Sequence, residues 1–195
     1  MKEKKGGKKK KVAWGITGNG EKLPETVTLL KELKETYENE IDIRVYLSKA
    51  GEQVTKWYKL YESLKKSFDR VWVESGPNSP FLAGELQLGK FEFLLIAPAT
   101  SNTVAKIATG ICDTLLCNSA IMALKALVPV YIMPSDLKEG NVVTKLPDGK
   151  DLHLRIRKED VENTRKLAGM EGISTLNGPE NIRNVFDKHF GPRQP

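Results

Sequence analysis

The chain has 195 residues and a mass of 21.8 kDa, with 39% hydrophobic and 29% charged residues. These values exclude a mini-protein, a disordered chain and a fibrous one, and no apolar run approaches the roughly 18 residues of a membrane span. We therefore predict a single globular domain over residues 12–195. The N-terminus has no apolar signal-peptide core, so we expect a cytoplasmic protein that makes no membrane contact.

The formal net charge of +6 comes from one end of the chain. Residues 1–11 contain seven Lys and one Glu, which leaves 24 basic and 24 acidic residues in the rest. A lysine run without apolar residues cannot pack, so we predict a flexible basic tail over residues 1–11. The neutral body argues against nucleic acid as the partner, and an RNA-binding or anion-binding arm is the alternative for the tail.

Cysteine and histidine are scarce. Cys112 and Cys117 match neither a redox pair nor a zinc site, and His153 and His189 stand far from other potential ligands in sequence. We expect no metal and no iron–sulfur cluster. Redox chemistry would then require an organic cofactor. A buried packing role is favoured for Cys112 over a redox thiol.

Strand and helix patterns alternate through the first 135 residues. The predicted strands are 10–16, 41–47, 70–74, 91–97 and 128–133. The predicted helices follow Pro24, follow Gly51 as far as Leu64, follow Thr103, and cover about 118–126. Crossovers of this length force parallel pairing, so the fold class is α/β, a three-layer Rossmann-like, flavodoxin-like parallel sheet with helices on both faces.

The pattern changes after residue 140. Pro147-Asp148-Gly149-Lys150 separates two alternating runs, 142–146 and 151–156, and predicts a late β-hairpin. A helix at 158–168, a strand at 173–176 and a helix from Pro179 complete the predicted elements.

Two early strand ends carry small and hydroxyl residues, and ligands of open parallel sheets bind beyond such ends. The first loop, Gly15 to Gly20, offers backbone N–H groups and the Thr17 hydroxyl to a phosphate, although a tight structural turn also explains its glycines. Its spacing is neither the dinucleotide fingerprint nor a P-loop. Ser48 ends the second strand, and it suits a phosphate, a ribityl hydroxyl or a helix cap.

The third strand-end loop is the most specific. Ala97-Pro98-Ala99-Thr100-Ser101-Asn102-Thr103, continuing to Gly110-Ile111-Cys112-Asp113-Thr114-Leu115-Leu116, resembles the P-A-(S/T)-x-N-T and G-I-x-D-x-L-L signatures of the flavoprotein superfamily. This superfamily includes phosphopantothenoylcysteine and lantibiotic-peptide decarboxylases, flavin prenyltransferases and a component of dipicolinate synthase. The glycine loop and Ser48-Lys49-Ala50 match in the same order, so the resemblance spans about residues 12–135.

The resemblance implies an FMN site. Gly18, Asn19, Gly20 and Ser48 would hold the phosphate, and Thr100, Ser101, Asn102 and Thr103 would meet the phosphate, the ribityl chain or the isoalloxazine edge. The matching segments also contain Gly15, Thr17, Lys49, Pro98 and Ala99. Neutral donors and acceptors suit the polar edges of a flavin. A helix cap rich in Ser and Thr would explain only one or two of these hydroxyls.

The chain departs from two branches of the superfamily. The histidine base of the decarboxylases would fall at Gly84, and Ser135-Asp136 replaces the Arg-Glu pair of the prenyltransferases. No catalytic residue is therefore assigned. The opening Ala13-Trp14-Gly15 and the late hairpin are more similar to the archaeal branch, the archaeoflavoproteins, to which dihydromethanopterin reductases are related.

That resemblance implies a redox flavoprotein. It would be an FMN-dependent oxidoreductase that takes electrons from ferredoxin or another iron–sulfur carrier and passes them to a downstream acceptor. The alternatives are a flavin-dependent decarboxylase, a flavin prenyltransferase, a dihydromethanopterin reductase and a flavin-storage protein. The family also implies a homo-oligomer with the flavin near subunit interfaces. Packing in the core or at an interface is favoured over flavin stacking for the aromatic residues Trp14, Trp57, Tyr58, Tyr61 and Trp72.

Overall fold

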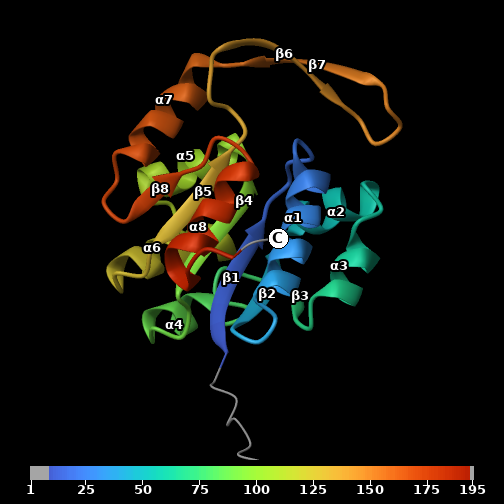
Figure 1. The fold of residues 1–195 in the computed structure, drawn as a ribbon. Helices are drawn as coiled ribbons and strands as arrows, with labels where there is room; N and C mark the ends of the chain where they lie inside the picture. Colours follow the sequence, from blue (N-terminus) through green and yellow to red (C-terminus); the bar gives the residue numbers. More distant parts are fainter. Residues whose placement is uncertain (1–8, 194–195) are drawn as a thin grey trace, which may run out of the picture.

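Six parallel strands form the central sheet of the computed structural model, which describes residues 9–193 (Figure 1). Their spatial order is β3-β2-β1-β4-β5-β8. The strands are β1 (Lys10–Ile16), β2 (Ile41–Leu47), β3 (Val71–Val73), β4 (Phe93–Ala99), β5 (Val130–Pro134) and β8 (Ile173–Thr175). The predicted three-layer α/β fold is confirmed.

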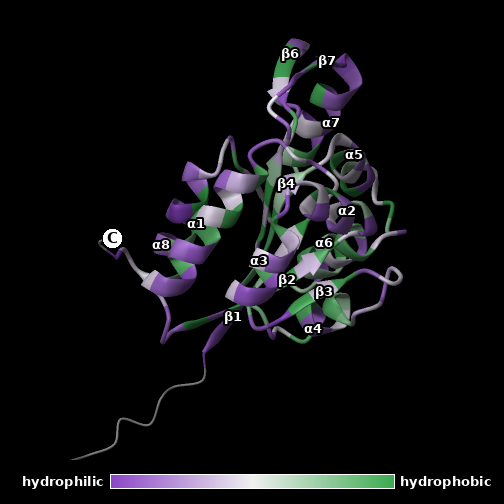
Figure 2. Ribbon diagram, turned by 90° about the vertical axis from the view of Figure 1, so that its right-hand side faces the viewer, coloured by the Kyte–Doolittle hydropathy of each residue, from purple (hydrophilic) through white to green (hydrophobic). Residues whose placement is uncertain are grey.

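Helices cover both faces of this sheet (Figure 2). They are α1 (Leu23–Thr36), α2 (Lys49–Trp57), α3 (Tyr61–Ser67), α4 (Leu82–Gln87), α5 (Ser101–Thr109), α6 (Leu115–Lys125), α7 (Lys158–Ala168) and α8 (Glu180–Phe190). One core packs Leu30 of α1 and Phe186 of α8 against the sheet, and the other packs Leu86 of α4 and Leu116 of α6. Two faces covered by helices explain why β4 is buried at every residue and β1 from Val12 onward.

The central strand β1 shows how the two cores share one element. Val12, Trp14 and Ile16 belong to the first core, whereas Ala13 between them belongs to the second, as the two-residue period of a strand requires. The Trp14 indole is fully buried and its Nε1 donates to the Ala97 carbonyl at 2.8 Å. The strand is therefore fixed both by apolar burial and by a satisfied polar contact.

The connections reverse direction next to β1. The chain leaves β1 into α1, which packs in the first core, and it leaves the neighbouring β4 into α5 and α6, which pack in the second. The loops after these two strands thus diverge, and they open a crevice at the carboxyl edge of the sheet.

A two-stranded hairpin crosses this carboxyl edge (Figure 1). Its strands are β6 (Gly140–Lys145) and β7 (Asp151–Ile156), paired in antiparallel register so that Val142 faces Leu154 and Thr144 faces Leu152. The hairpin predicted around Pro147 to Lys150 is confirmed. Within residues 9–193, no helix is both long and apolar enough to cross a membrane.

Several predicted boundaries were wrong for local reasons. The helix expected through Leu64 is two helices, because Lys59 between them has a φ of 57°. The strand β4 continues through Pro98 and Ala99, where its register against β5 shifts. The short helix α4 was not predicted. The side chains of Thr100 and Thr114 cap α5 and α6, which therefore begin earlier than expected.

The boundary predicted for the basic tail lies too far along the chain. Lys10 and Lys11, included in the expected tail, pair with Ile41 and Asp42 as the first residues of β1. Lys9 is exposed and lies before the strand, and residues 1–8 of the expected tail lie outside the described residues.

Gly51 provides a test of the close packing of α2 on β1. A Cβ at this position would lie 2.3 Å from the Ile16 carbonyl oxygen, a backbone atom that cannot move away. We expect Gly51→Ala to lower the free energy of unfolding by about 1–3 kcal/mol. Gly169→Ala is the matched control, since its nearest atom would be 3.6 Å away and its φ is −85°. Urea denaturation of both variants checks this, and equal stabilities would contradict it.

Candidate functional site

The Thr17 hydroxyl ties together the ends of β1 and β4. Its side chain is 2% exposed; the hydroxyl donates to the Pro98 carbonyl at 2.9 Å and accepts from the Thr100 N–H at 2.8 Å. The Thr17 N–H also donates to the Pro98 carbonyl, at 3.3 Å. The Thr17 hydroxyl was expected to bind a phosphate, but its hydrogen is donated to the Pro98 carbonyl instead. Thr17 therefore positions the two loops.

The glycine turn after β1 approaches two other elements closely. A Cβ on Gly18 would lie 2.6 Å from the Ala50 Cβ, and one on Gly20 would lie 2.4 Å from the Tyr58 ring. Only glycine permits this approach. Between them, Asn19 accepts the Glu21 N–H through its Oδ1 at 2.9 Å, while its Nδ2 is buried and has no hydrogen-bond partner among the described residues. A buried amide donor of this kind indicates a ligand acceptor.

Ser48 caps helix α2 at the end of β2. Its Oγ accepts the Gly51 N–H at 2.9 Å, so the helix-cap alternative raised from the sequence is confirmed. The cap leaves the hydroxyl hydrogen available to an acceptor outside the protein. Lys49, the next residue, is exposed at the first turn of α2.

The polar residues that follow β4 differ in their hydrogen-bond partners and in their exposure. Thr100 caps α5 and contacts the Thr103 hydroxyl at 3.0 Å. The Ser101 hydroxyl donates to the Asp136 carboxylate beyond β5, and Asn102 is exposed on the surface of α5. Most of these hydroxyls therefore have hydrogen-bond partners within the protein, whereas the Asn102 amide is exposed.

A cavity of about 430 Å³ lies between the strand ends and the hairpin. Five predicted site residues line its floor: Gly18, Asn19, Gly20, Thr100 and Ser101. The hairpin forms its ceiling, with the side chains that share one face of the two strands: Val142, Thr144, Leu152, Leu154 and Ile156. Trp57, Tyr58, Ser135 and Asp136 also line the cavity. A polar floor under an apolar ceiling suits a planar ring with polar substituents on one side.

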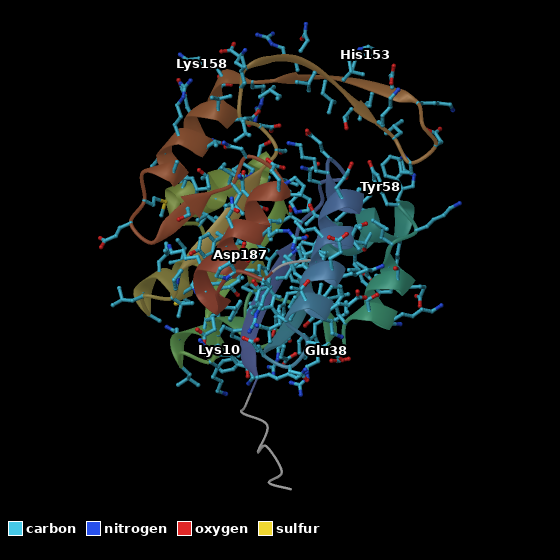
Figure 3. All side chains as sticks on the ribbon, viewed as in Figure 1. Lys10, Glu38, Tyr58, His153, Lys158 and Asp187 are labelled. Atoms are coloured by element: carbon cyan, nitrogen blue, oxygen red, sulfur yellow. The ribbon has the colours of Figure 1, made fainter. Side chains whose placement is uncertain are left out.

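Tyr58 joins the body of the protein to the hairpin (Figure 3). Its hydroxyl donates to the Lys145 carbonyl at 3.2 Å, close to the tip of β6. His153 projects from the other face of the hairpin, paired across the strands with Val143. The tyrosine therefore fixes the distance between ceiling and floor at the side of the cavity nearest α2.

The charged residues of the cavity lining are three acidic ones, Glu21, Asp136 and Asp160, and two basic ones, Lys145 and Arg155. Burial raises the pKa of Glu21; Asp136 and Glu25 raise it further, and Lys22 opposes them. Asp160 behaves differently, because hydrogen bonds from the Arg157 guanidinium at 2.9 and 2.7 Å lower the pKa of its carboxyl. The cavity thus contains one neutralised carboxylate and two without a cation partner within residues 9–193.

These features can be compared with known proteins. A family model described as Flavoprotein matches residues 1–144. The chain belongs to the flavoprotein family. The resemblance recognised in the strand-end motifs is thereby confirmed at the level of the family, whereas the narrower archaeoflavoprotein resemblance stays a prediction.

Two archaeal relatives match this flavoprotein over almost its whole length. One is the uncharacterised protein MJ0730 of Methanocaldococcus jannaschii, 54% identical over 92% of this chain and 96% of the relative. Another is the dihydromethanopterin reductase (acceptor) of the same organism, 31% identical over 91% and 96% of the two chains.

A solved structure shares both fold and sequence with this flavoprotein. It is Burkholderia xenovorans DmrB in complex with FMN, described as a cubic protein cage for redox transfer. The two chains are 31% identical, the TM-score is 0.75, and the similarity covers 92% of this chain and 94% of that one.

Several predicted site residues lie away from the cavity. Gly15 packs inside the sheet, where a Cβ would lie 2.6 Å from Leu116, and Pro98 and Ala99 are buried within β4. Thr103 is buried in α5. These residues shape the loops, and flavin contact by any of the predicted residues stays a prediction.

Sequence analysis missed the residues that close the cavity. Trp57 was assigned to packing but is 55% exposed, and Tyr58 lines the cavity. The two-residue alternation of Val142, Leu152 and Leu154 predicted the hairpin, yet no signal in the sequence placed it over the strand ends. Asp136 was noted only as a departure from the prenyltransferases, although its position directly after a strand pointed to this edge.

The remaining candidates are explained by packing. A Cβ on Gly84 would lie 2.0 Å from the Phe81 ring, so this position has no room for the decarboxylase histidine in the observed conformation. Cys112, predicted to be buried, is only half-buried. Cys117 is buried, and burial is the main reason its thiol pKa is raised. His189 contacts Tyr131 at 2.9 Å, remote from the cavity lining. Residues 9–193 contain no cluster of metal ligands.

The bridging role of Thr17 predicts a stability effect. We expect Thr17→Val to lower the free energy of unfolding by about 1–3 kcal/mol, because the Thr100 N–H loses its acceptor. Thr28→Val is the matched control: its exposed hydroxyl donates within α1 at 3.0 Å, and we expect a change below about 0.5 kcal/mol. Chemical denaturation of both proteins provides the measurement, and a Thr17 variant as stable as the control would contradict the bridge.

Proposed function

We propose that this flavoprotein is an FMN-dependent oxidoreductase that reduces a small planar acceptor beneath the β6–β7 hairpin. The observation that carries the proposal is the unpartnered Asn19 amide on the glycine turn of the cavity. Membership of the flavoprotein family and the FMN complex of a structurally similar protein support the choice of cofactor.

The residues of the crevice fit FMN by chemistry. Gly18 and Gly20 let the turn pack closely against Ala50 and Tyr58. The buried Asn19 amide on this turn, and the Ser48 hydroxyl hydrogen beyond the cavity lining, would be donors for the phosphate. Thr100 and Ser101 offer hydroxyls to the ribityl chain or the ring edge. When bound, FMN supplies a ring that can take up and release one or two electrons.

The hairpin excludes water from the reacting ring and its partner. Val142, Leu152 and Leu154 share its inner face, and Leu152 and Leu154 are still 36% and 48% exposed in this structure. A planar substrate seated beneath them would bury this apolar surface, which favours binding. The hydroxyls of the floor would then orient its polar edge.

A dihydropterin is the substrate class we favour. The dihydromethanopterin reductase of M. jannaschii is 31% identical over nearly the whole length of both chains. A pterin is a flat heterocycle with polar substituents, which suits the polar floor and apolar ceiling of the cavity. The absence of the histidine base at Gly84 argues against decarboxylation of a cysteinyl substrate.

Ferredoxin or another iron–sulfur carrier is the proposed electron donor, on the strength of the resemblance to archaeoflavoproteins. We also propose a homo-oligomer in which a second subunit approaches the cavity. The similar protein DmrB is described as a cubic cage, and here the exposed Trp57 and Asn102 lie beside the candidate site, where a neighbouring chain would cover them.

The donor and cofactor are tested together by an anaerobic visible spectrum. Reduced ferredoxin with its regenerating system should bleach the yellow protein much faster than free FMN at the same concentration. A yellow protein that remains oxidised would refute the carrier, and release of carbon dioxide from a cysteinyl peptide would favour the decarboxylase. A colourless protein that cannot be reconstituted with FMN would refute the cofactor.

Asn19 provides the matching test on the protein. We expect Asn19→Ala to weaken FMN binding about 10- to 100-fold, since one hydrogen bond to a charged group contributes about 1.5–3 kcal/mol. Titration of the apoprotein, followed by quenching of FMN fluorescence, measures this change. Asn39→Ala, at an exposed turn before β2, is the control and should bind as the parent does. Equal affinities for the two variants would overturn the assignment.

A further inference from the structure

Glu21 and Asp136 line the cavity without an ion-pair partner among the described residues. Within residues 9–193, the Glu21 side chain forms no hydrogen bond and no ion pair. Asp136 accepts the Ser101 hydroxyl and likewise has no ion-pair partner in that range. Asp160, the third carboxylate of the cavity, is instead held by Arg157 at 2.7 Å. Two carboxylates thus line one cavity without a direct ion pair in that range.

The backbone fixes Glu21 in this position. Its N–H donates to the Asn19 side chain at 2.9 Å, and the following Lys22 adopts a left-handed conformation with a φ of 56°. A non-glycine residue in this region is strained and persists where surrounding contacts hold it. Here the Lys22 ammonium donates to the Asn177 carbonyl at 3.2 Å. The turn therefore directs the chain into α1 while Glu21 stays at the cavity.

Asp136 is fixed by hydrogen bonds from α5 and α7. Its carboxylate takes the Ser101 hydroxyl, and its backbone carbonyl accepts the Thr164 hydroxyl of α7 at 3.1 Å. The two carboxylates belong to the loops after β1 and β5, and they repel each other across the strand ends. When two acidic groups interact in this way, they favour a state in which one holds a proton.

Lys22 opposes this repulsion, and its effect on Glu21 is larger than that of Asp136 alone. The groups facing the pair are Lys22, Glu25, Tyr58, Lys145, Arg155, Arg157 and Asp160. Lys145 and Arg157 are already paired with Asp151 and Asp160. Lys22 and Arg155 are exposed, so water screens their charge. Burial and the neighbouring carboxylates consequently raise the pKa of Glu21 despite Lys22.

We propose that Glu21 is the acid that protonates the substrate, and that Asp136, held by Ser101, is the positioning residue that keeps the proton on Glu21. This inference rests on the proposed reductase function. In reduction of a C=N bond, the carbon takes a hydride equivalent, two electrons and one proton, from reduced flavin. The π electron pair moves to nitrogen, which takes a proton from the Glu21 carboxylic acid. The resulting carboxylate regains its proton from water.

The pH dependence has a definite sign. The reaction needs Glu21 in its protonated form, so its rate falls as the pH rises through the raised pKa of Glu21. Replacing Asp136 by Asn removes the repelling charge, lowers the pKa of Glu21 and moves this fall to lower pH. The Asn side chain can still accept the Ser101 hydroxyl, which keeps the loop in place.

The experiment uses FMN-loaded, anaerobically reduced protein. Its rate of oxidation is measured between pH 5 and 9 with 7,8-dihydropterin, which must be protonated, and with ferricyanide, which needs no proton. We expect Glu21→Gln to lower the ratio of the first rate to the second by about 10²- to 10⁴-fold and to abolish the fall at high pH. Glu38→Gln is the control, because Glu38 lies at the end of the molecule opposite the hairpin (Figure 3).

Infrared difference spectra separate failure of this inference from failure of the proposed function. The C=O stretch of a protonated carboxylic acid should titrate in the FMN-loaded protein, disappear in Glu21→Gln and shift to lower pH in Asp136→Asn. If the parent oxidises with ferricyanide but never with 7,8-dihydropterin, the pterin substrate is wrong and the infrared titration decides whether Glu21 holds the proton. A Glu21→Gln protein with the parent's rate ratio, or with an unchanged infrared titration, would overturn the inference.

Discussion

The hydrogen bonds of the Thr17 hydroxyl hold together the two strands on which the site depends. β1 and β4 are neighbours in the sheet, but their following helices lie on opposite faces, so their loops diverge. Without a link, the glycine turn and the segment after Pro98 would be free to separate. Thr17 joins them by donating to the Pro98 carbonyl and accepting from Thr100. Thr17 therefore keeps the crevice at a defined width, and its hydroxyl hydrogen is not available to a ligand.

The sequence contains nearly all of the information for the sheet. The almost wholly apolar run at 91–97 and the hydroxyl-rich loop after Pro98 indicated a parallel α/β fold with its site at the carboxyl edge, because a strand buried on both faces is apolar along its length. The predicted helix boundaries were wrong where a single residue sets them. Thr100 extends α5 by capping it, and Lys59 divides a helical pattern that periodicity alone leaves unbroken.

The candidate site was less accessible to sequence reasoning, because residue type does not reveal how a hydrogen bond is used. Thr17, Ser48 and Ser101 all carry hydroxyls in motif positions, yet one bridges strands, one caps a helix and one holds a carboxylate. Asn19 is the opposite case, since its amide remains without a partner among the described residues. The ceiling of the cavity depends on a contact between Tyr58 and Lys145, which are 87 residues apart.

The arrangement of polarity gives the cavity its chemistry. The Asn19 amide of the glycine turn suits an anionic group, while Glu21 and Asp136, which have no ion-pair partner among residues 9–193, favour a neutral or proton-accepting group. The inner face of the hairpin lowers the local dielectric over both, which strengthens each electrostatic preference. A molecule that presents a phosphate to the turn and a ring to the hairpin satisfies both requirements. The acidic pair then faces the ring, where a proton is needed whenever electrons are delivered to nitrogen.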